Sequence, residues 1–482
     1  MRLISLIIIL LSIIPCSCKK ESDKIKDNIF KDEKIRAIYS LQDKRDSSGL
    51  LTYFKDKDLL YRKYAALSFA SVQDKAVVNE LLLLLSDSDP GVRLAAAYAL
   101  GQTGDIASES GLIERFSKEE SGNIKMAILE SLGKCGSDKA LGFLNNPALS
   151  GGDTSIMKGQ ALGIYRLVLR KKHSATGLKT VINTLLKSDS MDVRFYASNV
   201  LSRIREVELT KYFKDIRDLI GKENEKNIRM NLIIALGKRK GQEVIDLLRK
   251  LLESEKDQRV VANIIRALGK FEFDLVKDDL LKMVMNRSYQ TAVAASEVLL
   301  NIRSGKWQSN YLELARKTED WRVGSNLMRL SLRFAPDKGE ISSRIKGYYK
   351  KSIDPYERGA LLMALSEDPS NYPFVEEEVF TSVEKVVATS GMISISEMLS
   401  NKEFDPEKIV SGGKGSSTQR RIFADIFKRG IVSGDISLMA IASSALIDPR
   451  HKFIEVITDL TFLEELLNKY QLPSDFEKKR EI

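Results

Sequence analysis

Residues able to carry out chemistry are few in this chain, and they do not form a catalytic or metal-binding motif. Its 482 residues include two histidines, His173 and His451, and three cysteines. Two histidines cannot build a His-rich zinc site, and no His-Glu-x-x-His string occurs. A Ser-His-Asp triad would have to recruit one of these histidines, and neither lies in a recognisable motif. We therefore expect no catalytic residue, no bound metal and no cofactor.

Two short strings resemble ligand-binding loops, but each lacks residues that the chemistry needs. Ser411-Gly412-Gly413-Lys414 is similar to a phosphate loop, yet Lys408 stands where its first glycine is required. Asp87-Ser88-Asp89 is similar to the start of a calcium loop, yet the following glycine and bidentate glutamate are missing. We interpret the first string as a loop between helices and the second as a turn with a helix cap.

The amino terminus predicts export and lipid attachment. Leu3–Ile14 is a twelve-residue apolar run, shorter than the ~20 residues of a spanning helix and typical of a signal peptide. Cys18 follows, with Ser17 before it and two lysines after it, an arrangement that resembles the lipobox of bacterial lipoproteins. The resemblance implies a signal peptide over residues 1–17, lipid modification of Cys18, and a polar tether over residues 18–28.

Two alternatives to this processing stay open. Cys16 is a second candidate for modification, although Pro15 directly before it is poorly tolerated by signal peptidases. Ordinary secretory cleavage, with both cysteines incidental, is the other alternative. With the lipid attached, the protein would lie in the bacterial cell envelope, held to a membrane by its N-terminus. Cys135 is then the one cysteine besides the anchor, so we expect no intramolecular disulfide.

The elements that would position side chains come from a repeat with a period of 31 to 36 residues. Equivalent positions, here called marks, are Phe69, Leu100, Leu132, Tyr165, Leu201, Leu236, Leu268, Leu299, Ser331 and Leu365. Such a period is typical of helix pairs joined by short turns. Most residues eleven before the marks are good helix caps, so we expect the second helix of each pair to run from cap to mark. These cap positions are Asp58, Asp89, Ser121, Thr154, Ser190, Glu225, Asp257, Ser288, Asp320 and Asp354.

Other parts of the chain fit this frame to different degrees. The glycines that follow four of the marks are expected to leave the helix in a left-handed conformation. The first helix of a pair is clearest over Val77–Leu85. Beyond residue 370 the frame fades, and we expect further helices over 374–390, 420–429, 436–447 and 453–470. The four glycines are Gly101, Gly133, Gly237 and Gly269.

The repeat resembles the HEAT repeat, particularly the short form found in bilin-lyase-like proteins. The resemblance is specific over residues 89–101, with its Asp-Pro-x-Val-Arg start and Ala-Leu-Gly end, and partial over residues 121–133, 227–237 and 257–269. It implies an all-α fold, an α-solenoid of stacked antiparallel helix pairs, over residues 29–370. Residues 371–482 are expected to hold degenerate helical repeats and a C-terminal cap.

One part of the positive charge is regularly placed. The chain carries a formal net charge of +10, and a basic residue stands seven positions before many of the marks, a column here called the stripe. It could be a track for an anionic ligand or a structural ladder paired with cap carboxylates; we favour the ladder, because surface charge says little about a partner. The stripe comprises Arg62, Arg93, Lys125, Lys158, Arg194 and Arg229, with Arg358 far downstream.

These observations favour a lipid-anchored, non-enzymatic scaffold that binds a protein or peptide along the face formed by the second helices. Candidate contact residues on that face are Tyr98, Phe195 and Met230. Nucleic acid is not expected as a partner, because an exported protein is separated from the nucleic acid of the cell. Aromatic residues, which stack on bases, also amount to only 7% of the chain. Two alternatives are attachment of a chromophore, as in bilin-lyase-like proteins, and an envelope adhesin that uses the stripe on anionic surfaces.

Overall fold

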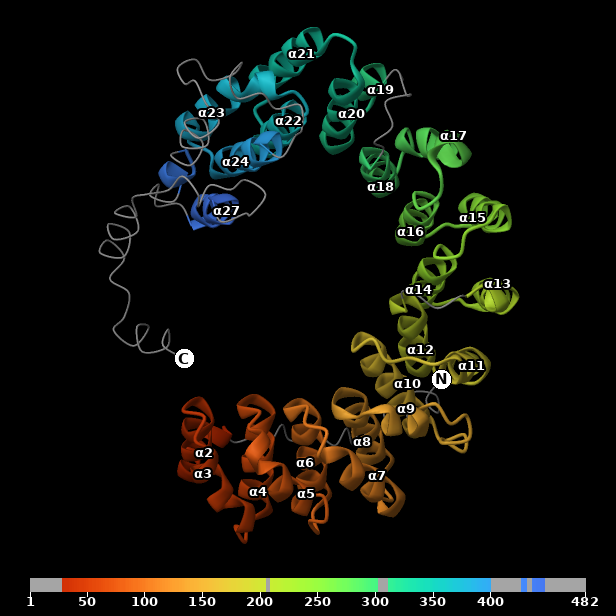
Figure 1. Cartoon of the computed structure of the whole chain (residues 1–482), viewed down its shortest axis with the longest axis vertical. Helices are drawn as coiled ribbons and strands as arrows, with labels where there is room; N and C mark the ends of the chain where they lie inside the picture. Colours follow the sequence, from red (N-terminus) through yellow and green to blue (C-terminus); the bar gives the residue numbers. More distant parts are fainter. Residues whose placement is uncertain (1–27, 205–208, 302–310, 400–425, 431–435, 447–482) are drawn as a thin grey trace, which may run out of the picture. The chain divides into compact units, whose positions relative to one another are not determined.

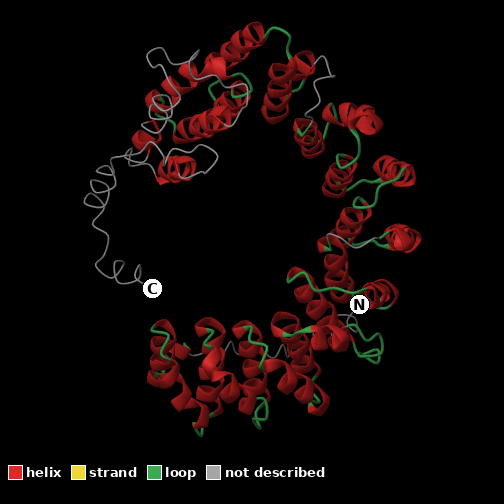
Figure 2. Cartoon of the chain, in the orientation of Figure 1, coloured by secondary structure: helices red, strands yellow, loops and turns green. Residues whose placement is uncertain are grey.

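The computed structural model describes residues 28–204, 209–301, 311–399, 426–430 and 436–446. Regular structure in these residues is helical throughout, with no strand among them (Figure 2). The chain divides into two compact units, residues 1–239 and 240–482, which are treated separately below. The predicted signal peptide, Cys16, Cys18 and nearly all of the tether lie outside the described residues, as do His451 and the loop at Gly412.

The described residues of the first unit form five 3₁₀ turns and thirteen α-helices. The turns are η2 (Ile29–Lys31), η3 (Thr52–Lys55), η4 (Lys75–Val77), η5 (Leu185–Lys187) and η6 (Thr210–Tyr212). The helices are α2 (Glu33–Asp43), α3 (Ser47–Leu51), α4 (Leu59–Val72), α5 (Val78–Leu84), α6 (Pro90–Thr103), α7 (Ser108–Lys118), α8 (Gly122–Cys135), α9 (Asp138–Leu144), α10 (Thr154–Leu169), α11 (Ala175–Asn183), α12 (Met191–Arg203), α13 (Phe213–Lys222) and α14 (Lys226–Leu236).

The second unit follows the same alternation. Its described elements are α15 (Gln242–Ser254), α16 (Gln258–Leu268), α17 (Phe273–Val284), α18 (Tyr289–Leu300), α19 (Tyr311–Lys317), α20 (Trp321–Phe334), α21 (Lys338–Lys351), α22 (Pro355–Leu365), η7 (Pro369–Asn371), α23 (Tyr372–Thr381), α24 (Lys385–Leu399) and α27 (Ile436–Leu446).

Second helices stack on one another to form one layer of each unit. In the first unit α4, α6, α8, α10, α12 and α14 each pack against the next, and in the second unit α16, α18, α20, α22 and α24 do the same. First helices form the other layer; Figure 1 shows α11 and α13 beside α12 and α14, and α15 and α17 beside α16 and α18. The predicted all-α solenoid of stacked antiparallel helix pairs is confirmed.

Small residues of the second helices lie in the core between the layers. On α6 the buried side chains include Ala95, Ala96 and Ala99, while Leu81 and Leu112 fill the adjoining volume from α5 and α7. Short side chains allow second helices to approach closely, and longer ones from the first helices complete the packing. The predicted first helix over 77–85 is slightly shorter in the structure, because Val77 belongs to η4.

Second helices begin one residue after the predicted cap in every repeat but one. In α10 the cap is Asp153, whose carboxylate accepts from Ile156 N at 2.9 Å, so the predicted Thr154 is wrong by one residue. The serines predicted as caps of α8, α12 and α18 make no side-chain bond to their helices. Before α8 the turn is held by Glu119, which accepts from Ser121 N at 3.1 Å. Carboxylates that do accept from the first turn of their helices are Asp58, Asp89, Asp257, Asp320 and Asp354.

The expectation that the four glycines are left-handed is wrong. Helix α6 continues past Gly101 to Thr103, and the Gly104 that follows it does have a positive φ of 69°. A Cβ on Gly101 would collide with Ser131 of α8, and a Cβ on Gly133 would collide with the backbone of Gly163 in α10. Glycine is therefore needed here for close contact between neighbouring second helices. The other two predicted glycines, Gly237 and Gly269, have φ values of −67° and −62°.

The helix-pair pattern continues past residue 370. The single helix predicted over 374–390 is wrong: α23 ends at Thr381, Ser382 is extended, and α24 starts at Lys385. Helix α24 packs against both α23 and α22, as a second helix does in the preceding repeats. α27 falls within the helix predicted over 436–447, whereas the predicted helix over 453–470 lies outside the described residues. The domain boundary at residue 370 stays a prediction.

Candidate binding face

The exposed side of the second helices carries large apolar side chains in the first unit. Leu94 and Tyr98 lie one turn apart on α6, and both are exposed. Leu67 on α4 is also exposed and stands two residues before its mark, as Tyr98 does. We call this side of the second helices the binding face. Single exposed apolar residues are ordinary, but Leu67 and Tyr98 share one repeat position on two stacked helices.

The three residues predicted to contact a partner occupy two positions of the same helix face. Tyr98 is exposed, and Phe195 on α12 and Met230 on α14 are half-buried. Phe195 and Met230 stand six residues before their marks, as Leu94 does, which is one helical turn from the Tyr98 position. The sequence analysis missed Leu67 and Leu94, although their repeat positions would have found them.

A small charged cluster extends this face from α6 to α10. The ammonium of Lys134 lies 5.1 Å from the ring centroid of Tyr98 and 3.1 Å from Glu130. Arg166 of α10 contacts the same Glu130 oxygen at 2.7 Å. Burial alone would raise the pKa of Glu130, but the hydrogen bonds from Arg166 and Lys134 outweigh it and lower that pKa. The binding face is therefore amphipathic at this point, with an aromatic ring beside a fixed ionic group.

The arginines of the stripe form ion pairs with the following repeat. Arg62 Nε lies 2.7 Å from Asp87, Arg93 Nε lies 2.9 Å from Glu119, and Arg194 Nε lies 2.8 Å from Glu223. Each pair is bidentate, since the Nη2 of the same guanidinium bonds the second carboxylate oxygen. These acids stand two residues before the cap of the next second helix. The cap carboxylates expected as partners are thus the wrong ones for these arginines.

Each of these arginines also holds the turn before its own helix. Arg93 Nη1 donates to the carbonyl oxygens of Asp87 and Ser88 at 3.0 and 3.1 Å. Arg194 Nη1 makes the equivalent bonds to Ser188 and Asp189, both at 2.9 Å. One guanidinium therefore connects the turns of two successive repeats, a geometry that a planar five-donor group can satisfy and an ammonium cannot.

The acid of the best enclosed pair is strongly perturbed. Glu119 is 1% exposed and also bonds Arg115 at 2.7 Å. Its burial acts to raise the pKa, yet the hydrogen bonds from Arg93 and Arg115 lower the pKa of Glu119 to about 2. The carboxylate is therefore charged at neutral pH and committed to structure rather than to proton transfer.

The other stripe members make different contacts. Lys158 pairs with Asp192 at 2.6 Å, Lys125 lies 5.4 Å from the ring centroid of Phe116, and Arg229 is half-buried on α14. Arg358, downstream, lies 3.3 Å from Glu384 and 3.4 Å from Glu378. Most of the stripe thus contacts acidic or aromatic side chains, which supports the ladder rather than an open cationic track.

A further set of basic residues, missed in the sequence, lies at the opposite ends of the second helices. Arg170 donates to the carbonyl oxygen of Gly136 at 2.8 Å, Lys238 to those of Leu201, Ser202 and Ile204 at 2.5 to 2.8 Å, and Arg333 to that of Leu300 at 2.7 Å. The last carbonyls of a helix lack partners within it and carry negative partial charge, so a cation there is stabilising. The sequence could have indicated these contacts, because each of the three basic residues stands two to five positions after a mark.

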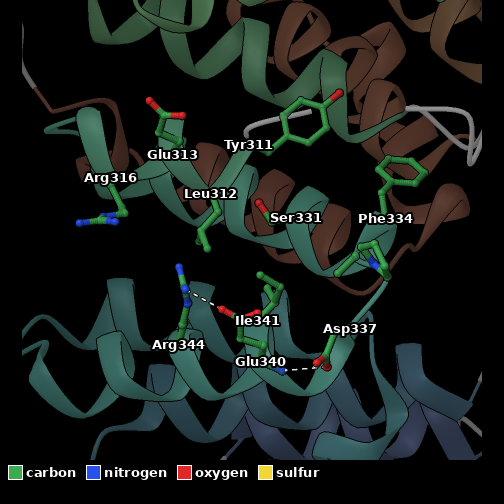
Figure 3. Close-up of a pocket in the computed structure, with 12 residues that line it drawn as sticks. Tyr311, Leu312, Glu313, Arg316, Ser331, Phe334, Asp337, Glu340, Ile341 and Arg344 are labelled. Atoms are coloured by element: carbon green, nitrogen blue, oxygen red, sulfur yellow. Dashed lines mark hydrogen bonds and ion pairs between the residues drawn. The ribbon is translucent and has the colours of Figure 1, made fainter. Parts of the chain in front are cut away.

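Two grooves beside first helices have mixed charge. One of about 470 Å³ lies between α19, α20 and α21 (Figure 3), with the apolar side chains of Leu312 and Ile341 among its walls. Another, of about 710 Å³, lies beside α13 and has more acidic than basic residues in its lining. The charged residues of the first groove are Glu313, Arg316, Asp337, Glu340 and Arg344.

Chemically reactive groups are sparse in the part of the chain that the structure describes. Burial raises the pKa of the Cys135 thiol to about 12, which leaves it unreactive at neutral pH. Among the described residues, no three His, Cys, Asp or Glu side chains gather in a way that could hold a metal ion. No described helix combines the length and the apolar character needed to cross a membrane.

Comparison with known families agrees with the repeat geometry. The family model described as HEAT repeats matches residues 47–133, 178–269 and 213–301. Over these segments the chain is similar to HEAT repeats. HEAT-type solenoids present extended binding surfaces along stacked helices, and this architecture is typical of protein-interaction scaffolds. No curated protein matches the sequence significantly.

Two solved structures illustrate how far structural similarity extends. An engineered protein determined as a structural-genomics target is 17% identical, with a TM-score of 0.32, and the match covers 84% of this chain and 99% of that chain. A structure from work on a phosphorylation switch that controls the interaction between cadherin and beta-catenin is 12% identical, with a TM-score of 0.31, covering 87% and 96%. At such scores neither structure bears on the function of this chain.

Proposed function

We propose that this protein is a non-enzymatic scaffold, lipid-anchored in the bacterial cell envelope, that binds a protein or peptide along its binding face. The observation that carries the proposal is that Leu67 of α4 and Leu94 and Tyr98 of α6 are exposed on two second helices that pack against each other. A few residues supply most of the affinity in protein interfaces, and tyrosine is enriched among them.

The stripe supports a protein-binding scaffold over an adhesin for anionic surfaces. Acidic residues of the protein itself pair with much of its regularly placed positive charge, so no anionic ligand is needed to explain that charge. Arg62, Arg93 and Arg194 are largely enclosed and bonded to acids of the next repeat. An adhesin for anionic surfaces would need such charges to be open to solvent. The proposal of a lipid anchor rests on the Ser17-Cys18 string and on the apolar run before it.

Site-specific photo-crosslinking in native membranes tests the scaffold. Benzoylphenylalanine replaces Tyr98 in one variant and Phe195 in another, and the matched control carries it at Leu83, which is 76% exposed on the first helix α5. We expect discrete adducts from positions 98 and 195 and none from position 83. Adducts of equal yield from all three positions, or from position 83 alone, would contradict a partner on the binding face.

A further inference from the structure

Three consecutive second helices of the second unit lack the stripe. The residues at its position in α16, α18 and α20 are Val261, Ala292 and Gly324, before Arg358 restores it in α22. Arginines stand instead two residues after the caps of α16 and α20, as Arg259 and Arg322. In α16 and α20 the arginine therefore stands at an exposed position near the helix start rather than at the enclosed position of the stripe.

A groove of about 270 Å³ lies where these arginines converge. Its walls include Arg259 and Arg266 from α16, Tyr289 and Gln290 from α18, and Arg322 from α20. Three guanidinium groups thus face the groove, and no acidic residue is among the described residues that line it. The grooves beside α13 and α19, by contrast, include several carboxylates.

The arginines are held in place from behind and stay accessible. Arg259 bonds the carboxylate of its own cap, Asp257, through Nε and Nη2, and Arg322 bonds Asp320 in the same way. A guanidinium has five N–H donors, so each keeps donors for a second carboxylate. The side chains of Arg259, Arg266 and Arg322 are 49%, 53% and 43% exposed, against 15% for Arg93 in the ladder.

An exposed aromatic ring lies between the charges. Tyr289 is 54% exposed, and the guanidinium carbon of Arg322 lies 4.9 Å from its ring centroid. The stacked pair gives a flat surface that can cover the aliphatic part of a bound side chain. The amide side chains of Asn263 and Gln290 complete the lining with groups able to pair with a peptide main chain.

We propose that this groove binds acidic side chains of an extended segment of the partner, an inference that rests on the scaffold function proposed above. Arginine recognises carboxylates by two parallel bonds, which matches the free donors here. The volume lies below the ~300 to 1,000 Å³ of sites that enclose a whole small ligand, so it suits one or two side chains. Helices α16 and α20 are two packing distances apart, roughly 16–20 Å. An extended peptide covers that span with about five or six residues.

Fluorescence anisotropy with defined peptides tests the proposal on the full-length protein in detergent. The probe is a fluorescein-labelled decapeptide of alternating Glu and Ala, and its control replaces each Glu with Gln. We expect the Glu peptide to bind at least tenfold more tightly than the Gln peptide. The Arg259→Gln/Arg322→Gln variant should lose at least tenfold in affinity for the Glu peptide and show a weaker salt dependence.

A matched variant separates recognition from net charge. Arg217→Gln/Arg344→Gln removes the same charge from exposed arginines on α13 and α21, and we expect less than a twofold loss. Charge reversal, Arg259→Glu/Arg322→Glu, should shift preference to a Lys-Ala decapeptide. Equal losses in the two Gln variants would overturn the proposal, as would failure of the Glu peptide to bind, or binding of phosphatidylglycerol vesicles in place of the peptide.

The two proposals fail independently. If adducts form at positions 98 and 195 but the Glu peptide does not bind, the scaffold stands and the acidic recognition is wrong. If the Glu peptide binds but no adduct forms on the binding face, the groove acts without the scaffold role proposed for the first unit.

Discussion

Arg93 and Glu119 stand 26 residues apart in the chain and form a two-point ion pair between successive repeats, with N–O distances of 2.9 and 3.1 Å. Arg93 bonds the turn before its own helix as well, so one side chain fixes the spacing of two helix pairs. In a solenoid each repeat is stabilised by its neighbours alone. This pair is therefore a local determinant of stacking, and the sequence repeats it at Arg62 and Arg194.

Arg93→Ala should destabilise the protein without abolishing partner binding. The substitution leaves Glu119 buried with Arg115 as its remaining cation, and removing one partner of a buried pair typically costs about 3 kcal/mol. Arg194→Ala should act similarly, because Glu223 is also largely buried. Urea unfolding followed by circular dichroism measures the change.

The control for this measurement is Arg217→Ala, which removes an exposed arginine paired with its neighbour Asp218. An exposed pair contributes less than about 1 kcal/mol, so its unfolding midpoint should stay close to that of the unaltered protein. An Arg93→Ala/Arg194→Ala protein that is fully stable yet has lost its partner would show that the stripe is a binding track.

Acid should weaken the same contact. The pKa of Glu119 is lowered to about 2 from a usual 4.5, so its contribution is fully present above about pH 4.5 and is lost as the pH falls toward 2. The difference corresponds to about 3 kcal/mol of unfolding free energy. Glu119→Gln lacks this titration, and its stability should therefore fall less between pH 5 and pH 2. Parallel pH profiles for the two proteins would contradict the assignment.

Local features of the fold were predictable, and contacts between repeats were not. The starts of α4 and α22 follow from Asp58 and Asp354, because a cap acts within one turn of its own helix. The partner of Arg93 depends on which residue the next turn places nearby, which the spacing of marks does not specify. The sequence analysis therefore expected Arg93 to pair with a cap carboxylate and did not identify Glu119 as its partner.

The groove at Tyr289 could not be predicted from the sequence either, because it is formed by side chains from several repeats. The absence of the stripe at Val261, Ala292 and Gly324 is visible in the sequence, but its consequence depends on three helices packing side by side. Arg259, Tyr289 and Arg322 come from three different repeats. No single repeat contains the constellation, so a search for motifs within one repeat cannot find it.

The anchor prediction concerns Cys18. If the Ser17-Cys18 string directs lipid attachment, Cys18→Ala should move the protein from the detergent phase to the aqueous phase in a Triton X-114 partition, because the acyl chains are lost. Cys16→Ala is the matched control and should stay in the detergent phase. Mass spectrometry of the N-terminal peptide checks the modification directly, and an unmodified mature N-terminus beginning at the lysines would refute it.

Gly133 and Gly142 provide a test of how closely the second helices must approach. A Cβ on Gly133 would lie 2.7 Å from the Cα of Gly163 and would also collide with its carbonyl oxygen, so backbone would have to move. We expect Gly133→Ala to cost about 1–3 kcal/mol of unfolding free energy, as overpacking does. Gly142 on α9 has open space around its Cβ position, so Gly142→Ala should be neutral or stabilise by up to about 1 kcal/mol through helix propensity. Equal stabilities of the two variants in urea unfolding would mean that α8 and α10 pack less closely than the structure has them.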